Sequence, residues 1–165
     1  MKVSGSVRFG ETRPTVYVYL ARDALAHAIE RVEDDEIDRP RTILTSYRTR
    51  ALGFSVVTTR EAQLEPGISI TWKHVAGPLS GSVEAISLTV LKGGATIALY
   101  DGTVVARDRV LRFPPAAYFV GLLAKNASLG LLKGAQDAFE GKIPSEGDGI
   151  LMDGGVGDID GDGGM

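Results

Sequence analysis

The sequence predicts an α+β domain in which a curved antiparallel sheet of about six to seven strands wraps around a long C-terminal helix. Two observations support this fold class. Between residues 42 and 107, alternating apolar and polar segments are separated by short turns that contain glycine or proline, as in consecutive antiparallel strands. Residues 113–140 instead repeat apolar residues at steps of three and four, as a helix does. We expect this last helix to cover one face of the sheet.

The chain opens with one predicted strand and two short predicted helices. Residues 2–9 place valine, glycine or phenylalanine at every odd position, which is the period of a half-buried strand. Thr12 can cap a helix that accepts Pro14 in its first turn, and Asp23 can cap a second helix over residues 24–29. The β-branched residues of 15–19 favour a strand by propensity alone, so that segment keeps a strand as its alternative.

The remaining strands are predicted from alternation and from the turns between them. The clearest is residues 68–75, whose alternation places Ile68, Ile70, Trp72 and His74 on one face. Short turns follow at Gly67, between Gly77 and Gly81, and at Gly93–Gly94. The predicted strands are 33–37 (short and acidic), 42–51, 54–64, 68–75, 83–91 and 96–107.

The C-terminal helix begins at a pair of prolines, Pro114 and Pro115, which lose no hydrogen bond in a first helical turn. One of its faces carries mostly small apolar side chains: Val120, Ala124, Ala127, Leu131, Ala135 and Ala138. Such a face does not fill the space against a sheet, and a close-packed protein leaves that space only where something occupies it. We therefore expect a cavity between helix and sheet. The alternative is that small residues let the helix lie very close to its neighbour.

Composition and charge exclude several classes of function. The chain has no cysteine, which excludes disulfides, thiolate metal sites and cysteine nucleophiles. Its net charge is −3, and six acidic residues fall in the last twenty, which leaves 18 basic and 15 acidic residues in 1–145. This weak positive charge, without a basic stripe, does not indicate nucleic-acid binding. No signal peptide or membrane-spanning run is evident, so we expect a cytoplasmic protein.

The Gly/Asp-rich end is predicted to be a flexible acidic tail over residues 144–165, after a folded domain of residues 1–143. Asp158, Asp160 and Asp162 reproduce the opening of a calcium loop, but the closing glutamate is absent because the sequence ends at Met165. We expect no metal there and no cofactor elsewhere. Ile150, Leu151 and Met152 form a short apolar patch that could dock on the domain or on a partner.

Several segments resemble the START-like (SRPBCC) superfamily. They are residues 1–7, 13–20 and 25–29, the stretch from Gly81 to Glu84, residues 93–100, and the final helix ending at 132–140. The opening segments look like two of its branches, that of the carbon monoxide dehydrogenase G subunit and that of the polyketide cyclase/dehydrase proteins. Over residues 1–142, the resemblance implies a helix-grip fold, a helix rather than a strand at 16–19, and a deep cavity for lipids, quinones, sterols or polyketides. The superfamily shares no universal catalytic residue, so the resemblance implies none here.

Aromatic and polar residues of the predicted strands could line such a cavity. If the protein is an enzyme, His74 is the candidate general base, with Tyr100 or Tyr47 donating to an oxyanion. A lone histidine near a strand end is more often solvated or satisfied in the core, and no second titratable residue at a telling spacing supports it. The predicted lining residues are Tyr47, Phe54, Val56, Ile70, Trp72, His74, Tyr100, Val120, Ala124, Ala127 and Leu131.

A basic and apolar edge precedes the last helix. Arg107, Arg109 and Arg112 alternate with apolar residues there and could contact an anionic membrane surface, a partner enzyme or a second copy of the chain. The alternative is that the three arginines form an ordinary solvent-exposed face. The sequence as a whole predicts a non-catalytic carrier of a hydrophobic small molecule. The alternatives are a polyketide cyclase or related hydrolase, and an accessory protein that serves a molybdenum hydroxylase such as carbon monoxide dehydrogenase.

Overall fold

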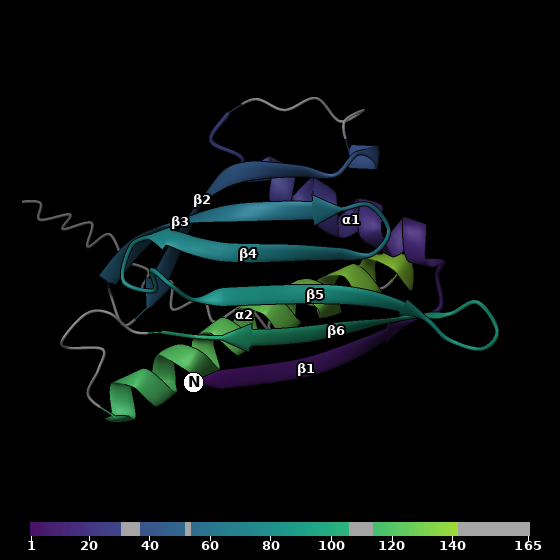
Figure 1. Ribbon diagram of the computed structural model, residues 1–165. Helices are drawn as coiled ribbons and strands as arrows, with labels where there is room; N and C mark the ends of the chain where they lie inside the picture. The colour runs from purple at the N-terminus through teal and green to yellow at the C-terminus, as the bar shows by residue number, and fades with distance from the viewer. Residues whose placement is uncertain (31–36, 52–53, 106–113, 142–165) are drawn as a thin grey trace, which may run out of the picture.

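A computed structural model of the chain describes residues 1–30, 37–51, 54–105 and 114–141 (Figure 1). The side chains of 49–51, 54–56, 114–120 and 123 lie outside the described part. Six strands and two helices follow one another as β1 (Lys2–Phe9), α1 (Arg13–Ala26), β2 (Arg41–Ala51), β3 (Phe54–Glu65), β4 (Ser69–Ala76), β5 (Val83–Val90), β6 (Thr96–Thr103) and α2 (Pro114–Phe139).

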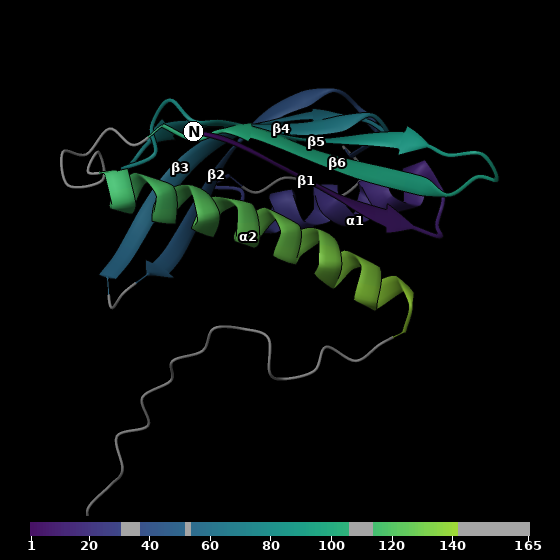
Figure 2. The same cartoon turned by 90° about the horizontal axis from the view of Figure 1, so that it is seen from below.

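The strands form one antiparallel sheet in the order β1-β6-β5-β4-β3-β2. The five strands from β2 to β6 are consecutive hairpin neighbours, and β1 returns to pair with β6. Both helices lie on the same face of the sheet, called the inner face below, and the ends of β2 and β3 bend toward the helices (Figure 2). The predicted α+β architecture, a curved antiparallel sheet around a C-terminal helix, is therefore confirmed.

The segment after β1 is one continuous helix, so the prediction of two short helices is wrong in this detail. Pro14 occupies the first turn as expected, but Asp23 lies inside the helix and caps nothing. Burial overrides the β propensity of residues 15–19, because helical spacing brings five side chains of α1 into the core. These are Val16, Tyr17, Leu20, Ala21 and Ala24.

Three smaller predictions differ from the structure or fall outside its described residues. Ile68 was expected on β4, but it precedes that strand and is 55% exposed, because the turn at Gly67 (φ +67°) still includes it. The last predicted strand ends at Thr103 rather than at residue 107, and residues 106–107 lie outside the described ranges. The acidic strand predicted at 33–37 falls almost wholly outside them as well, and Ile37 is buried without belonging to a strand.

Three contacts set the direction of α2 along β1. The side chain of Met1 lies against Gly121, Leu129 lies over Gly5, and the Gln136 amide donates to the Arg8 carbonyl at 3.1 Å. A Cβ atom on Gly5 would stand 2.6 Å from Leu129 Cδ2, so this glycine allows the close approach of the helix. Along the β1 edge, Gly5 and Gly121 therefore serve close packing.

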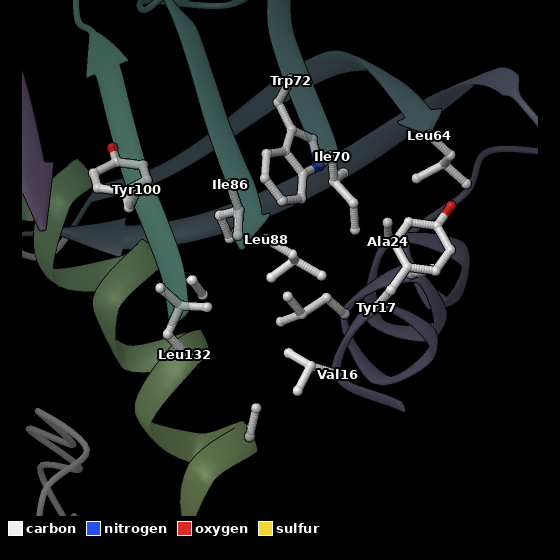
Figure 3. Packing of buried hydrophobic residues seen from close by; sticks show 14 of the residues in the cluster. Val16, Tyr17, Ala24, Leu64, Ile70, Trp72, Ile86, Leu88, Tyr100 and Leu132 are labelled. Carbon is white, nitrogen blue, oxygen red and sulfur yellow. The ribbon is translucent and has the colours of Figure 1, made fainter. Parts of the chain in front are cut away.

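The apolar core lies between the sheet, α1 and the second half of α2. Val16 and Tyr17 of α1 point toward Leu88 and Ile70, and Leu132 of α2 approaches from the other side (Figure 3). Most of this core is near the ends of the strands where β5 finishes and β6 starts. No helix in the described ranges is long and apolar enough to cross a membrane.

Candidate functional site

At the opposite end of the inner face, the sheet carries a buried group of polar side chains in place of an apolar core. We call Arg60, His74, Glu84 and Tyr100 the Glu84 cluster. Glu84 is 3% exposed, His74 5% and Tyr100 1%, so these three residues are shielded from solvent, while the Arg60 side chain is 18% exposed. Charged and polar groups are rarely buried to this extent unless they are paired.

Strand register brings the cluster together from four strands. Arg60 on β3 is opposite His74 on β4, while Glu84 on β5 is opposite Trp72 on β4 and Gly102 on β6. These residues alternate with outward-facing neighbours and so share the inner face. A Cβ atom on Gly102 would lie 3.2 Å from the Tyr100 hydroxyl oxygen and 3.4 Å from Glu84 Cγ. The missing side chain of Gly102 therefore leaves room for the tyrosine to reach the carboxylate.

Glu84 is the centre of the hydrogen bonding. Tyr100 donates its hydroxyl proton to Glu84 Oε1 at 2.7 Å, and His74 Nε2 lies 2.9 Å from Oε2. Arg60 also approaches Oε2 at 3.5 Å. Burial alone would raise the pKa of Glu84, but the hydrogen bonds from His74 and Tyr100 and the positive charge of Arg60 outweigh it and lower the pKa. Glu84 is therefore a carboxylate, and His74 Nε2 must donate to it.

The same contacts change the pKa of Tyr100 in the opposite direction. Burial, followed by the hydrogen bond and the charge of Glu84, raises the pKa of Tyr100 well above its ordinary value. Ser128 of α2 lies close enough to this tyrosine to oppose the rise in its pKa. Because a hydroxyl has one proton and Tyr100 gives it to Glu84, Tyr100 holds the carboxylate and is not free to stabilise an oxyanion.

Tyr47 on β2 extends the site toward the edge of the sheet. Its ring lies between two other groups: the His27 ring stacks on it at 4.2 Å between centroids, and Arg60 Cζ is 3.5 Å from its centroid. Burial raises the pKa of Tyr47, and the charge of Arg60 opposes the rise. The guanidinium is thus held between an aromatic face and a buried carboxylate.

Two polar atoms of the cluster are buried without a hydrogen-bond partner among the described residues. They are His74 Nδ1 and Arg60 Nε. Trp72 Nε1, close to them on β4, also lacks a hydrogen bond of good geometry there, although the indole is near enough to Tyr47 to lower that tyrosine's pKa. An unsatisfied buried polar atom costs about 1–3 kcal/mol, so such atoms usually contact a water molecule or a ligand.

The structure brings four of the predicted site residues together and separates others. Tyr47, Trp72, His74 and Tyr100 share the polar end of the inner face. Ile70 instead belongs to the apolar core, where it is 1% exposed. The side chains of Phe54, Val56 and Val120 lie outside the described residues.

The α2 residues expected to line the cavity differ in their exposure to solvent. Ala124 and Leu131 are half-buried against the core, but Ala127 and Ala138 are exposed. The fully buried pair is Leu132 and Ala135. Ala135 belongs to the expected face and Leu132 does not, so the buried face of α2 is turned from the expected one by about one residue.

Sequence reasoning missed Glu84 and Arg60. The statement that no titratable partner supports His74 is wrong, because Glu84 is that partner. A signal was present: alternation along β5 puts Glu84 on the same side as the buried Ile86 and Leu88. A carboxylate at a core position of a strand requires a partner, and that requirement could have identified the cluster.

A surface hollow of about 740 Å³ lies on the outer side of α1, next to the C-terminal end of α2. Its lining residues are Pro14, Thr15, Val18, Tyr19, Arg22, Asp23 and Phe139. None of the eleven predicted cavity residues is among them. The hollow is therefore separate from the predicted space beneath α2, whose covering side chains at 114–120 are outside the described part.

Within the described ranges, no three histidine or acidic side chains are placed to hold a metal ion. The aspartates of the calcium-like sequence, Asp158, Asp160 and Asp162, lie outside those ranges. The basic edge at Arg107, Arg109 and Arg112 does too.

Comparison with known proteins gives a consistent result for the fold. No protein-family model matches the sequence, and no curated protein matches it. Among solved structures, a protein from Thermus thermophilus is similar with a TM-score of 0.67 and 12% identity, over 86% of this chain and 98% of that one. A START superfamily protein from Mycobacterium smegmatis is similar with a TM-score of 0.57 and 16% identity, over 84% and 98% of the two chains.

An aromatase/cyclase from Streptomyces sp. R1128 is also similar, with a TM-score of 0.54 and 14% identity, over 84% of this chain and 95% of that one. Identities this low establish a shared architecture and leave function open. The chain has a helix-grip fold like that of these solved structures, a START superfamily protein and an aromatase/cyclase among them.

Proposed function

We propose that the protein binds a hydrophobic small molecule between the inner face of the sheet and α2, with the polar group of the ligand against the Glu84 cluster. The ligand class is that of lipids, quinones or polyketide-like compounds. The proposed binding domain is residues 1–143, which the acidic tail of residues 144–165 follows.

One observation carries this proposal: the inner face changes from an apolar core to a buried polar cluster flanked by Trp72 and Tyr47. Small-molecule sites combine apolar and aromatic walls with a few polar groups of fixed position, and this surface has that composition. It faces α2 at Ser128, which is close enough to Tyr100 to affect the pKa of that tyrosine. The fold shared with a START superfamily protein and an aromatase/cyclase supports the same class of function.

Purified full-length protein tests the proposal directly. Native mass spectrometry, followed by organic extraction and identification of the extract, should find an apolar small molecule bound in a stoichiometric amount. The variant Ala124→Phe should lose it, because Ala124 lies one helical turn before Ser128 on the same side of α2 and is half-buried.

The matched control is Ala138→Phe, which adds the same ring at an exposed position of α2. Loss of ligand in the first variant and retention in the second supports the location. A protein that carries no ligand and takes up none of a panel of lipids, quinones and aromatic ketones would refute the function. Equal ligand content in both variants would refute its placement beneath α2.

A cyclase or hydrolase is the second candidate, favoured by the pairing of His74 with Glu84. An ionised carboxylate that accepts from Nε2 holds the imidazole in one orientation and leaves Nδ1 as the basic atom of the neutral ring. His74→Ala would then abolish turnover while the ligand remains bound. Wild-type protein that returns every bound ligand chemically unchanged would leave only the carrier function.

The same proposal includes a route for the ligand. The ligand would pass to or from the site through contact with a molybdenum hydroxylase, a membrane surface or a second copy of the chain. Residues 107–112, which suggested such contacts, are outside the described ranges. Co-purification of the tagged protein from a cytoplasmic extract, with and without the substitution of all three arginines by glutamine, tests this route.

A further inference from the structure

We propose that the polar group of the ligand is neutral and carries oxygen, as in a ketone, quinone or phenol, because Arg60 Nε and His74 Nδ1 are buried without partners beside a carboxylate that already holds both residues. This inference rests on the proposed function and specifies the chemistry of its ligand. A carboxylate or phosphate group is expected to bind poorly.

The positions of the two unpartnered atoms support a single contact region. Arg60 and His74 are opposite each other on neighbouring strands, so their side chains leave the same face of the sheet side by side. Both residues are anchored through their other nitrogens: Arg60 NH1 lies 3.5 Å from Glu84 Oε2, and His74 Nε2 lies 2.9 Å from the same oxygen. The remaining atoms, Nε and Nδ1, have no partner of their own within the described part of the chain.

The donor and acceptor character of these atoms defines the complementary group. Arg60 Nε carries a proton and can only donate, so it requires an acceptor oxygen. His74 Nδ1 on a neutral ring is an acceptor, which a ligand hydroxyl satisfies, and on a charged ring it donates to a carbonyl. A carbonyl with a neighbouring hydroxyl therefore meets both requirements without any charge on the ligand.

Charge in the site disfavours an anion. The guanidinium of Arg60 already faces the Glu84 carboxylate, whose lowered pKa keeps it ionised. An anionic ligand group at Arg60 Nε would be brought near that buried carboxylate, where repulsion is strong because little water screens it. A neutral oxygen gains the hydrogen bond without this penalty.

Three probes of matched shape test the inference in the wild-type protein: 1-hydroxy-2-acetonaphthone, 1-hydroxy-2-naphthoate and 2-ethylnaphthalene. Trp72 is the only tryptophan of the chain and lies on the same strand as His74, so quenching of its fluorescence reports binding at this place. We expect the hydroxyketone to bind at least tenfold more tightly than the carboxylate and the hydrocarbon. Equal or tighter binding of the carboxylate would overturn the inference.

Variants then assign the preference to its residue. Arg60→Met should bring the affinity for the hydroxyketone down to that for 2-ethylnaphthalene, while Arg48→Met, an exposed arginine of β2, should leave it unchanged. Should Arg60→Met not fold, Arg60→Gln keeps a hydrogen-bond donor without the charge and should retain part of the preference.

An unchanged preference in the folded Arg60→Met variant would also overturn the inference. If 2-ethylnaphthalene binds as tightly as the hydroxyketone, the proposed function stands and the inference is overturned. If none of the three probes quenches the fluorescence of Trp72, both are contradicted.

Discussion

Replacing Tyr100 with phenylalanine removes one oxygen atom from the centre of the Glu84 cluster and tests whether this cluster is a formed unit. The lost hydroxyl donates to Glu84 Oε1 at 2.7 Å, and both residues are almost fully buried. A hydrogen bond to a charged group contributes about 1.5–3 kcal/mol, and its removal leaves a buried carboxylate oxygen without its donor. We therefore expect Tyr100→Phe to lower the free energy of unfolding by about 2 kcal/mol.

Urea denaturation monitored by far-UV circular dichroism measures this change, and the melting temperature should fall by about 4–8 °C for a domain of this size. The matched control is Tyr19→Phe, because the half-buried Tyr19 hydroxyl makes no hydrogen bond within the described residues. The control should change stability by less than about 0.5 kcal/mol. If the two variants were equally stable, the hydrogen bond between Tyr100 and Glu84 would not contribute as the geometry indicates.

Three further predictions concern the same residues and the packing around them. Because the pKa of Glu84 is lowered in the folded state, its charged form stabilises the fold at pH values above the ordinary pKa of 4.5. This contribution is lost as the pH falls through the lower pKa of the folded state. The difference in unfolding free energy between wild type and Glu84→Gln should therefore shrink as pH is lowered from 7 to about 3, and parallel curves would contradict the pairing. Gly102→Ala should cost about 1–3 kcal/mol by crowding the tyrosine hydroxyl, more than Gly10→Ala, whose Cβ would meet nothing within 4 Å. An equal loss in urea denaturation would argue against a crowded cluster. Gly5→Ala places a Cβ 2.6 Å from a leucine methyl of α2. Hydrogen exchange of the α2 amides should therefore become faster, while exchange in β3 and β4 stays unchanged. No change in the exchange of α2 would show that the helix is not held at this contact.

Local patterns in the sequence were sufficient for most of the architecture. The alternation along β4 and β5, the glycines with positive φ at 67, 93 and 94, and the prolines at the start of α2 each act over a few residues. For that reason the strands, their antiparallel order and the final helix could be predicted. The continuity of α1 could not, because Asp23 has the sequence signal of a helix cap and only packing against strands distant in sequence carries the helix through it.

The chemistry of the candidate site depended on contacts that no local pattern contains. The sequence placed Trp72 and His74 on one face and proposed Tyr100 for the same space, and the structure shows these residues together. The hydrogen bonds of Glu84 join residues 10 and 16 positions apart, and Arg60 reaches it from 24 positions away. Only strand register decides which of many polar residues meet, because a shift by one residue would turn each side chain to the other face. The sequence alone therefore determined the elements and their order, whereas the tertiary structure decided which stripe of α2 is buried and made Glu84 the centre of the site.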